Sequence, residues 1–226
     1  MFPVAYLRTC YPEKFGIPRQ SGLAPAAWGV VELAPDYRRP EAVRGLEKFS
    51  HLWLITQFHL INEEESAKVL TVRPPRAGGN ERRGVFATRS PFRPNRLGLT
   101  VARLDRIEWD HENSPRIWVS GIDLADGTPV FDIKPYVPYA DAIAHATSGF
   151  AAQAPVRIAV TWDTPAQPPD KERALIEQSL SLQPRPAYQN SPERLYSTEM
   201  ADWHLSWRST EQGIVITHCE PMERPS

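Results

Sequence analysis

Apolar residues along the chain occur in short runs separated by turn-forming residues, and long amphipathic repeats are rare. The runs are rich in Val, Ile and Trp and recur about every 10–15 residues, which is typical of β-sandwiches and closed barrels. The alternation of strands and helices that a parallel α/β sheet needs is missing. The pattern predicts strands over residues 28–33, 52–58, 68–73, 84–88, 97–104, 116–124, 129–136 and 156–162.

Two helices and a final hairpin complete the expected structure. Pro40 suits a first helical turn and apolar residues follow it at spacings of three, which predicts a helix over 40–49. A second helix is expected over 171–182, after a linker with the sequence QPPD. The expected hairpin strands are 203–207 and 213–219. We therefore predict a mainly β protein, with a main domain at 1–165 and a small α+β domain at 166–226.

The composition is that of an ordinary globular chain, with 226 residues, 41% hydrophobic and 23% charged. A net charge of −1 gives no overall attraction to nucleic acid, so any such attraction must come from local patches. Cys10 and Cys219 lie far apart and outside any metal-ligand spacing, which indicates a reducing setting without a metal. No signal peptide and no apolar run of the ~20 residues that span a bilayer is visible, so a cytoplasmic protein without a membrane segment is expected.

Residues 73–96 form the most unusual segment. Seven arginines and one glutamate give +6 over 24 residues, and no lysine is present. Arginine presents a rigid fork of donors that binds phosphate and stacks on bases, so a phosphate or RNA ligand is one interpretation. The structural alternative is a solvated basic loop that forms ion pairs with acids at 63–65. The arginines are Arg73, Arg76, Arg82, Arg83, Arg89, Arg93 and Arg96.

Three more segments contain polar residues in a suggestive order: IPRQSGL at 17–23, FSHLWLITQFH at 49–59, and GIDLADGTPVFDIKPYVPY at 121–139. Asp126-Gly127 is a turn pair between apolar runs, which predicts a hairpin or a tight loop. His51 and His59 would lie about 26 Å apart on one strand, too far for one metal site. A structural role is the alternative for each segment. No GxG pair, P-loop or HExxH is present, which disfavours a Rossmann enzyme.

Five segments together resemble the TrmO family, also called TsaA or YaeB-like. They are KFGIPRQSGL (14–23), VRGLEKFSHLWLI (43–55), VRPPRAGGN (72–80), GVFATRSPFRPNRLGLT (84–100) and DLADGTPVFDIKPYVPYAD (123–141). The resemblance implies a compact single-sheet β-barrel that binds S-adenosylmethionine (SAM) without a Rossmann fold and works as a homodimer. It implies methyl transfer to N6 of threonylcarbamoyladenosine at position 37 of tRNA, next to the anticodon.

The resemblance also implies the residues of the cofactor site. They are Pro18, Arg19, Gln20, His59, Leu60, Arg89, Leu99, Asp126, Gly127, Thr128 and Pro129. One departure is Arg96, which stands where the family usually has proline and adds a group able to bind phosphate.

Methyl transfer from a sulfonium is an in-line displacement in which the protein mainly positions the reactants. The N6 nitrogen is a poor nucleophile, because its lone pair is delocalised. We therefore expect Asp132, Lys134 or Tyr139 to accept or relay its proton, although the threonyl carboxylate of the substrate could do so instead. Two rival interpretations are an RNA-binding barrel without catalysis and a methyltransferase with another acceptor. The arginines expected to bind the anticodon stem-loop are Arg73, Arg76, Arg82, Arg83, Arg93 and Arg96.

Overall fold

A closed antiparallel barrel forms the larger part of the protein. The computed structural model describes residues 1–74, 81–184 and 194–222. The strand order around the barrel is β1-β2-β7-β6-β3-β8, and every neighbouring pair is antiparallel. This confirms the expected barrel. The strands are β1 (Ala5–Thr9), β2 (Trp28–Leu33), β3 (His51–Gln57), β6 (Leu97–Glu108), β7 (Arg116–Ser120) and β8 (Thr128–Pro135).

Alternating side chains explain why these runs form a barrel. In β3 every second residue is fully buried, so Leu52 and Leu54 point inward while Trp53 and Ile55 point outward. Leu7, Ile117 and Val130 join them in the interior with no exposed surface. Closing the sheet leaves none of these six strands as an unpaired edge.

The C-terminal part is a four-stranded sheet with one long helix, which confirms the expected α+β region. Its strand order is β10-β11-β12-β9, and β9 is parallel to β12. The sheet thus includes β9, which precedes the boundary expected after residue 165; the division into domains stays a prediction. The elements are β9 (Ala159–Trp162), α4 (Asp170–Leu180), β10 (Leu195–Met200), β11 (Trp203–Thr210) and β12 (Gly213–Pro221).

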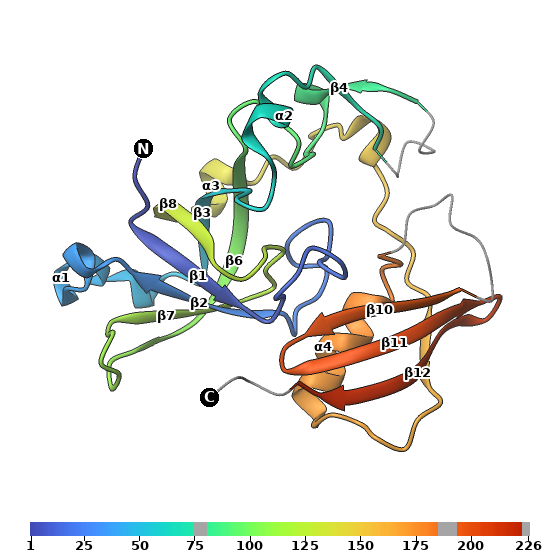
Figure 1. Cartoon of the computed structure of the whole chain (residues 1–226). Helices are drawn as coiled ribbons and strands as arrows, with labels where there is room; N and C mark the ends of the chain where they lie inside the picture. Colours follow the sequence, from blue (N-terminus) through green and yellow to red (C-terminus); the bar gives the residue numbers. More distant parts are fainter. Residues whose placement is uncertain (75–80, 185–193, 223–226) are drawn as a thin grey trace.

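The two sheets share one hydrophobic core, and Figure 1 shows them next to each other with α4 against the C-terminal sheet. The segment that follows β1 makes the connection. The hydroxyl groups of Tyr11 and Ser179 lie 2.8 Å apart, and the amide of Ala201 donates to the carbonyl of Cys10. The ring of Phe15 stacks on that of Trp207, with centroids 6.2 Å apart. The C-terminal sheet therefore packs directly against the loop that leads out of the barrel.

Short elements lie between β3 and β6 and at the remaining turns. In Figure 1 the chain around α2 and β4 extends away from the barrel strands. Helix α2 begins after Asn62, whose side chain accepts a hydrogen bond from the amide of Glu65 (3.1 Å). The short elements are α1 (Pro40–Val43), α2 (Glu63–Ala67), β4 (Thr71–Val72), β5 (Arg83–Gly84) and α3 (Pro138–Asp141), with 3-10 turns at Pro35–Tyr37, Leu46–Lys48, Val85–Ala87 and Gly149–Ala151.

Several element predictions were wrong. The helix over 40–49 is interrupted because Gly45 adopts a left-handed conformation (φ 89°) and the next turn is 3-10. The strand over 84–88 is mostly the 3-10 turn Val85–Ala87, and the strand over 68–73 is reduced to Thr71–Val72. Strands β1 and β10 were missed, although polar residues alternate with apolar ones in both.

Two negative findings concern the described residues only. They contain no helix long and apolar enough to cross a membrane. They also contain no group of three or more His, Cys, Asp or Glu side chains placed to hold a metal ion.

Candidate cofactor site at one end of the barrel

The turn before β8 is fixed to β1 through its backbone. The amide of Asp126 donates to the carbonyl of Tyr11 (2.8 Å), and the amide of Gly127 donates to the carbonyl of Leu7 (2.9 Å). Gly127 has a φ of 74°, a conformation that glycine adopts without strain. Thr128 closes the turn by donating its hydroxyl to the carbonyl of Ala125 (2.7 Å). The tight loop predicted at Asp126-Gly127 is therefore confirmed.

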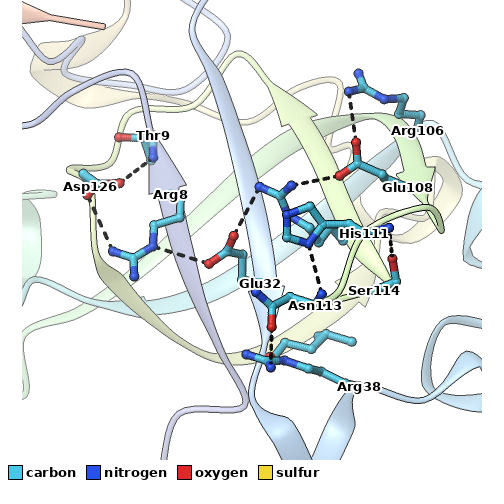
Figure 2. A network of polar contacts seen from close by, with 12 residues as sticks. Arg8, Thr9, Glu32, Arg38, Arg106, Glu108, His111, Asn113, Ser114 and Asp126 are labelled. Atoms are coloured by element: carbon cyan, nitrogen blue, oxygen red, sulfur yellow. Dashed lines mark hydrogen bonds and ion pairs between the residues drawn. The ribbon is translucent and has the colours of Figure 1, made fainter. Parts of the chain in front are cut away.

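The side chain of Asp126 points along β1. Its Oδ1 accepts from the amide of Thr9 at 2.8 Å, and its Oδ2 lies 3.7 Å from Nη1 of Arg8. Figure 2 shows Arg8 between Asp126 and Glu32, and the alternating charges continue to Arg116, 3.2 Å from Glu32. The carboxylate of Asp126 thus anchors the turn to β1, which leaves the backbone of the turn as the part that could contact a cofactor.

His59 faces this turn from the end of β3. A Cβ added to Gly127 would lie 3.8 Å from Nε2 of His59, within ordinary contact distance. Burial lowers the pKa of His59, and the negative charge of Asp126 partly opposes this effect. The next residue, Leu60, is exposed, and its carbonyl accepts from Nζ of Lys14 (3.1 Å). Two predicted cofactor segments, far apart in sequence, therefore lie in contact.

The loop that contains Pro18, Arg19 and Gln20 meets the arginine segment. Nη1 of Arg89 donates to Oε1 of Gln20 (2.5 Å), and Nε2 of Gln20 donates to the carbonyl of Arg19 (2.5 Å). Pro18 is buried, whereas Arg19 and Arg89 are exposed. The amide of Gly22 then donates to the carbonyl of Gly121 (2.7 Å), which ties this loop to the chain that leads into the Asp126 turn.

Asp123 is a polar residue of this region that sequence reasoning did not select. Its Oδ1 accepts from the hydroxyl of Thr100, on β6, at 2.7 Å. Burial raises the pKa of Asp123, while the bond from Thr100 and the charge of Arg89 act in the opposite direction. One signal could have indicated it: Asp123 interrupts an apolar run directly before a turn. Asp123 thus joins the predicted cofactor loops.

Leu99 lies on the opposite side of the sheet from its neighbour Thr100. Thr100 is buried in the barrel, and Leu99 is 61% exposed on the outer face. Leu99 pairs with Ile55 in β3, and Ile55 pairs with Asp132 in β8, so the three form a row across the outside of the barrel. The predicted site residues therefore extend from the barrel end onto this outer face.

The three predicted proton acceptors lie on the outer side of β8 and just after it. Nζ of Lys134 is 3.8 Å from Oδ2 of Asp132, and both side chains are more than half exposed. Tyr139, in α3, is 94% exposed. Asp132 follows Gly127 by five strand positions, or roughly 16 Å along β8. The structure brings Asp132 and Lys134 together, and their catalytic role stays a prediction.

The arginine segment uses several of its guanidinium groups within the protein. Arg96 donates to the carbonyl of Ile61 (3.1 Å) and pairs with Glu63 (2.6 Å), and its side chain is only 13% exposed. Arg93 donates to the carbonyl of Thr88 (3.2 Å). The ion pairing expected with acids at 63–65 is therefore confirmed for Arg96.

The other arginines of this segment are closer to solvent. Arg82 donates to the hydroxyl of Thr71 (2.8 Å), and Arg83 pairs with Glu81 (2.7 Å). Arg73 is exposed, and Arg76 lies outside the described residues. Phosphate binding by these side chains stays a prediction.

Sequence comparison decides the family. The sequence model of the tRNA-methyltransferase O N-terminal domain matches residues 6–142, and that of the TrmO C-terminal domain matches residues 153–222. The chain belongs to the TrmO family. The predicted family is thus confirmed, and both TrmO regions are present: the barrel and the C-terminal sheet with its helix.

Relatives with named functions cover nearly the whole chain. A putative S-adenosylmethionine-dependent methyltransferase RcsF of Pseudomonas aeruginosa is 49% identical, over 94% of each chain. The tRNA (adenine(37)-N6)-methyltransferase of Escherichia coli K12 is 39% identical, over 96% of each chain. A crystal structure of TrmO from P. aeruginosa superposes with a TM-score of 0.77 at 40% identity, covering 97% of this chain and 95% of that one.

Proposed function

We propose that this TrmO-family protein transfers the methyl group of SAM to N6 of adenosine 37 in tRNA. The observation that carries the proposal is the convergence of separate segments at one end of the barrel, where Gln20 contacts Arg89 and His59 faces Gly127. The proposed substrate is tRNA with a threonylcarbamoyl group on that adenosine, and the proposed location is the cytoplasm. The names of the E. coli and P. aeruginosa relatives support the reaction type and the methyl donor.

The side chains at this end suit SAM in their chemistry. Arg89 is exposed and could bind the carboxylate of the methyl donor, since guanidinium groups bind carboxylates well. The backbone of the Asp126 turn and the ring of His59 would form a wall beside it, and Leu99 offers exposed apolar surface. SAM supplies an activated methyl group, and the protein residues position it and orient the acceptor.

Asp132 is the best-placed proton acceptor of the three predicted residues. A carboxylate accepts a proton directly, whereas a lysine must first lose one. Its strand neighbour is Ile55, which also neighbours Leu99, so Asp132 and Leu99 are roughly 10 Å apart across the sheet. Tyr139 is much more exposed and lies beyond the end of the strand. The proton on N6 would pass to Asp132 as the N–CH₃ bond forms and the S–CH₃ bond of the methyl donor breaks, leaving neutral S-adenosylhomocysteine.

The proposed tRNA surface is the exposed part of the arginine segment. Arg73 and Arg82 are exposed, and the pair between Arg83 and Glu81 lies in solvent, where ion pairs are weak. Such a pair could therefore exchange for a phosphate contact. We expect these side chains to bind phosphates of the anticodon stem-loop, with Arg89 next to the cofactor.

We also propose a homodimer, supported by the outer face of β6, β3 and β8. On this face Leu99 is 61% exposed and lies beside Ile55, while Trp53 packs on Tyr136 with centroids 5.7 Å apart. Exposed apolar surface of this kind is typical of subunit interfaces. A second copy would pack beside this row and enclose the site between the two barrels.

The reaction is tested with labelled SAM and two tRNAs that differ only in the threonylcarbamoyl group. We expect label on the modified tRNA alone. Label on both would discard the requirement for the modification. No label with SAM still bound would indicate another acceptor. If the tRNAs are not labelled and SAM does not bind, the favoured interpretation becomes an RNA-binding barrel without catalysis.

Asp132→Asn is the matched variant for the proton acceptor, because it keeps the size of the side chain. We expect turnover to fall by about 100-fold or more, since a general base typically contributes 10²–10⁴-fold. The dissociation constant for SAM should stay the same. Turnover within a few-fold of the wild type would discard Asp132 as the base and favour the threonyl carboxylate of the substrate.

A further inference from the structure

The carboxylate of Asp123 is enclosed by three parts of the predicted cofactor site. Thr100 donates to it from β6 at 2.7 Å. The backbone N–H of Ser21 faces it from the loop that contains Arg19 and Gln20. The chain continues from Asp123 directly into the turn at Asp126. Asp123 therefore lies where the separate segments of the site meet.

Among the described residues, Asp123 has hydrogen-bond donors but no cation in contact. Within residues 1–74, 81–184 and 194–222, no arginine, lysine or histidine nitrogen lies within 4.0 Å of its carboxylate oxygens. Arg89 is close enough to influence it electrostatically but forms its hydrogen bond with Gln20. Burial raises the pKa of Asp123, so the negative form is costly in the protein alone. A ligand that brings a positive charge would offset that cost.

We propose that Asp123 is a cofactor-binding residue whose carboxylate faces the sulfonium charge of SAM. This inference rests on the proposed function, because it assumes that the methyl donor occupies this end of the barrel. SAM has two positive groups, the sulfonium and the ammonium. A sulfonium has no N–H to donate, so it suits a carboxylate that already accepts from Thr100 and lacks only a counter-charge.

The consequence is discrimination between SAM and its demethylated product, S-adenosylhomocysteine. The two molecules have the same carboxylate, ammonium and adenosine, but the sulfur of the product is neutral. Asp123 would therefore favour the methyl donor and lose this attraction once the methyl group has left. Because specificity is a difference between affinities, the ratio of the two dissociation constants measures the effect directly.

The test uses Asp123→Asn, which keeps an oxygen to accept from Thr100 and removes the charge. Calorimetric titration of SAM and of S-adenosylhomocysteine gives both dissociation constants without any turnover. We expect the constant for SAM to rise about tenfold or more, as on removing one partner of a buried charge pair, and that for the product to change less than about threefold. Asp105→Asn is the control, since Asp105 accepts from Ser120 and pairs with Arg103 elsewhere on the barrel.

A pH series provides a second readout. Protonation of Asp123 removes its charge, so SAM binding by the wild type should weaken as pH falls through the raised pKa, while product binding should change much less. The ionisable groups that face Asp123 are Arg89 and Tyr11. Burial raises the pKa of Tyr11, so its hydroxyl stays neutral while Asp123 titrates. The variant should lose the pH-dependent difference between the two ligands.

The Asp123→Asn variant should fold. A carboxyl group whose pKa is raised on folding costs more free energy to ionise in the folded protein than in the unfolded chain, and the variant avoids that cost. The charged carboxylate of Asp123 therefore destabilises the folded protein at pH values above its raised pKa. The ligand-free Asp123→Asn variant should melt at or above the wild-type temperature at neutral pH. Equal weakening of both ligands, or of neither, would overturn the sulfonium assignment. A wild type that binds neither ligand would instead overturn the proposed function, and the inference with it.

Discussion

The barrel strands and the arginine segment, residues 73–96, are held in place by different forces. In β3, Leu54 is fully buried, and backbone ladders connect the strand to β6 and β8. Between β5 and β6, arginine side chains hold the chain by donating to carbonyl groups, as Arg93 does to Thr88 and Arg96 to Ile61. The barrel is thus fixed by apolar burial, and the segment by polar contacts at single residues.

The seven arginines are therefore not one functional group. Arg96 is largely enclosed and paired with Glu63, whereas Arg82 is exposed and donates to the hydroxyl of Thr71. A buried, paired guanidinium is costly to withdraw from its partners, but an exposed one is readily available to a phosphate. The comparison therefore divides the segment into structural and potential RNA-binding arginines.

The largest effect is expected at Leu54, inside the barrel. Leu54→Ala should lower the free energy of unfolding by about 2–5 kcal/mol, because it leaves a cavity in a packed interior. Urea denaturation measures this decrease. Ile55→Arg is the matched change on the outer face of the same strand: it should leave the barrel folded and shift the protein toward monomers in sedimentation. A barrel that tolerates Leu54→Ala within about 1 kcal/mol would contradict the comparison.

An intermediate effect is expected at Arg96. Its φ is 51°, which proline cannot adopt because its ring fixes φ at about −65°. Its amide also donates to the carbonyl of Arg93 (2.9 Å), and proline has no amide hydrogen to donate. Arg96→Ala should cost about 1–2 kcal/mol of unfolding free energy, because the bonds to Ile61 and Glu63 can no longer form. Arg96→Pro should cost more, although proline is the usual family residue. The same denaturation experiment ranks the two, and a proline variant as stable as the wild type would show that this turn can rearrange.

The smallest effect on stability is expected for Arg82→Ala combined with Arg83→Ala, within about 0.5 kcal/mol, because both lie near the surface. The tRNA affinity should fall, and the salt dependence of binding should flatten by about 0.7–0.9 for each phosphate that the variant no longer binds. Filter binding over a range of salt concentrations measures the slope. The control is Arg44→Ala, at the exposed end of α1, which should leave the salt slope of tRNA binding unchanged. An unchanged slope in the double variant would show that Arg82 and Arg83 do not bind phosphates of the tRNA.

The residue pattern alone indicated a mainly β protein and the turn at Asp126-Gly127, whereas the closed barrel was expected only from the resemblance to the TrmO family. Alternating apolar residues must bury one face of each strand, and an Asp-Gly pair between such runs favours a turn, so both follow from local rules. Local pattern also explains the errors. Gly45 ended the helix that begins at Pro40, and β1 was missed although its residues alternate, since the strand is only five residues long.

The contacts of the site residues follow from the three-dimensional arrangement of the strands and not from the residue pattern. Asp126 directs its carboxylate to Thr9 and Arg8, and Asp123 comes to face Thr100 from a different strand. These relations depend on contacts between residues more than 20 positions apart. Strand register and barrel closure set them, and neither can be obtained from a local pattern of residues.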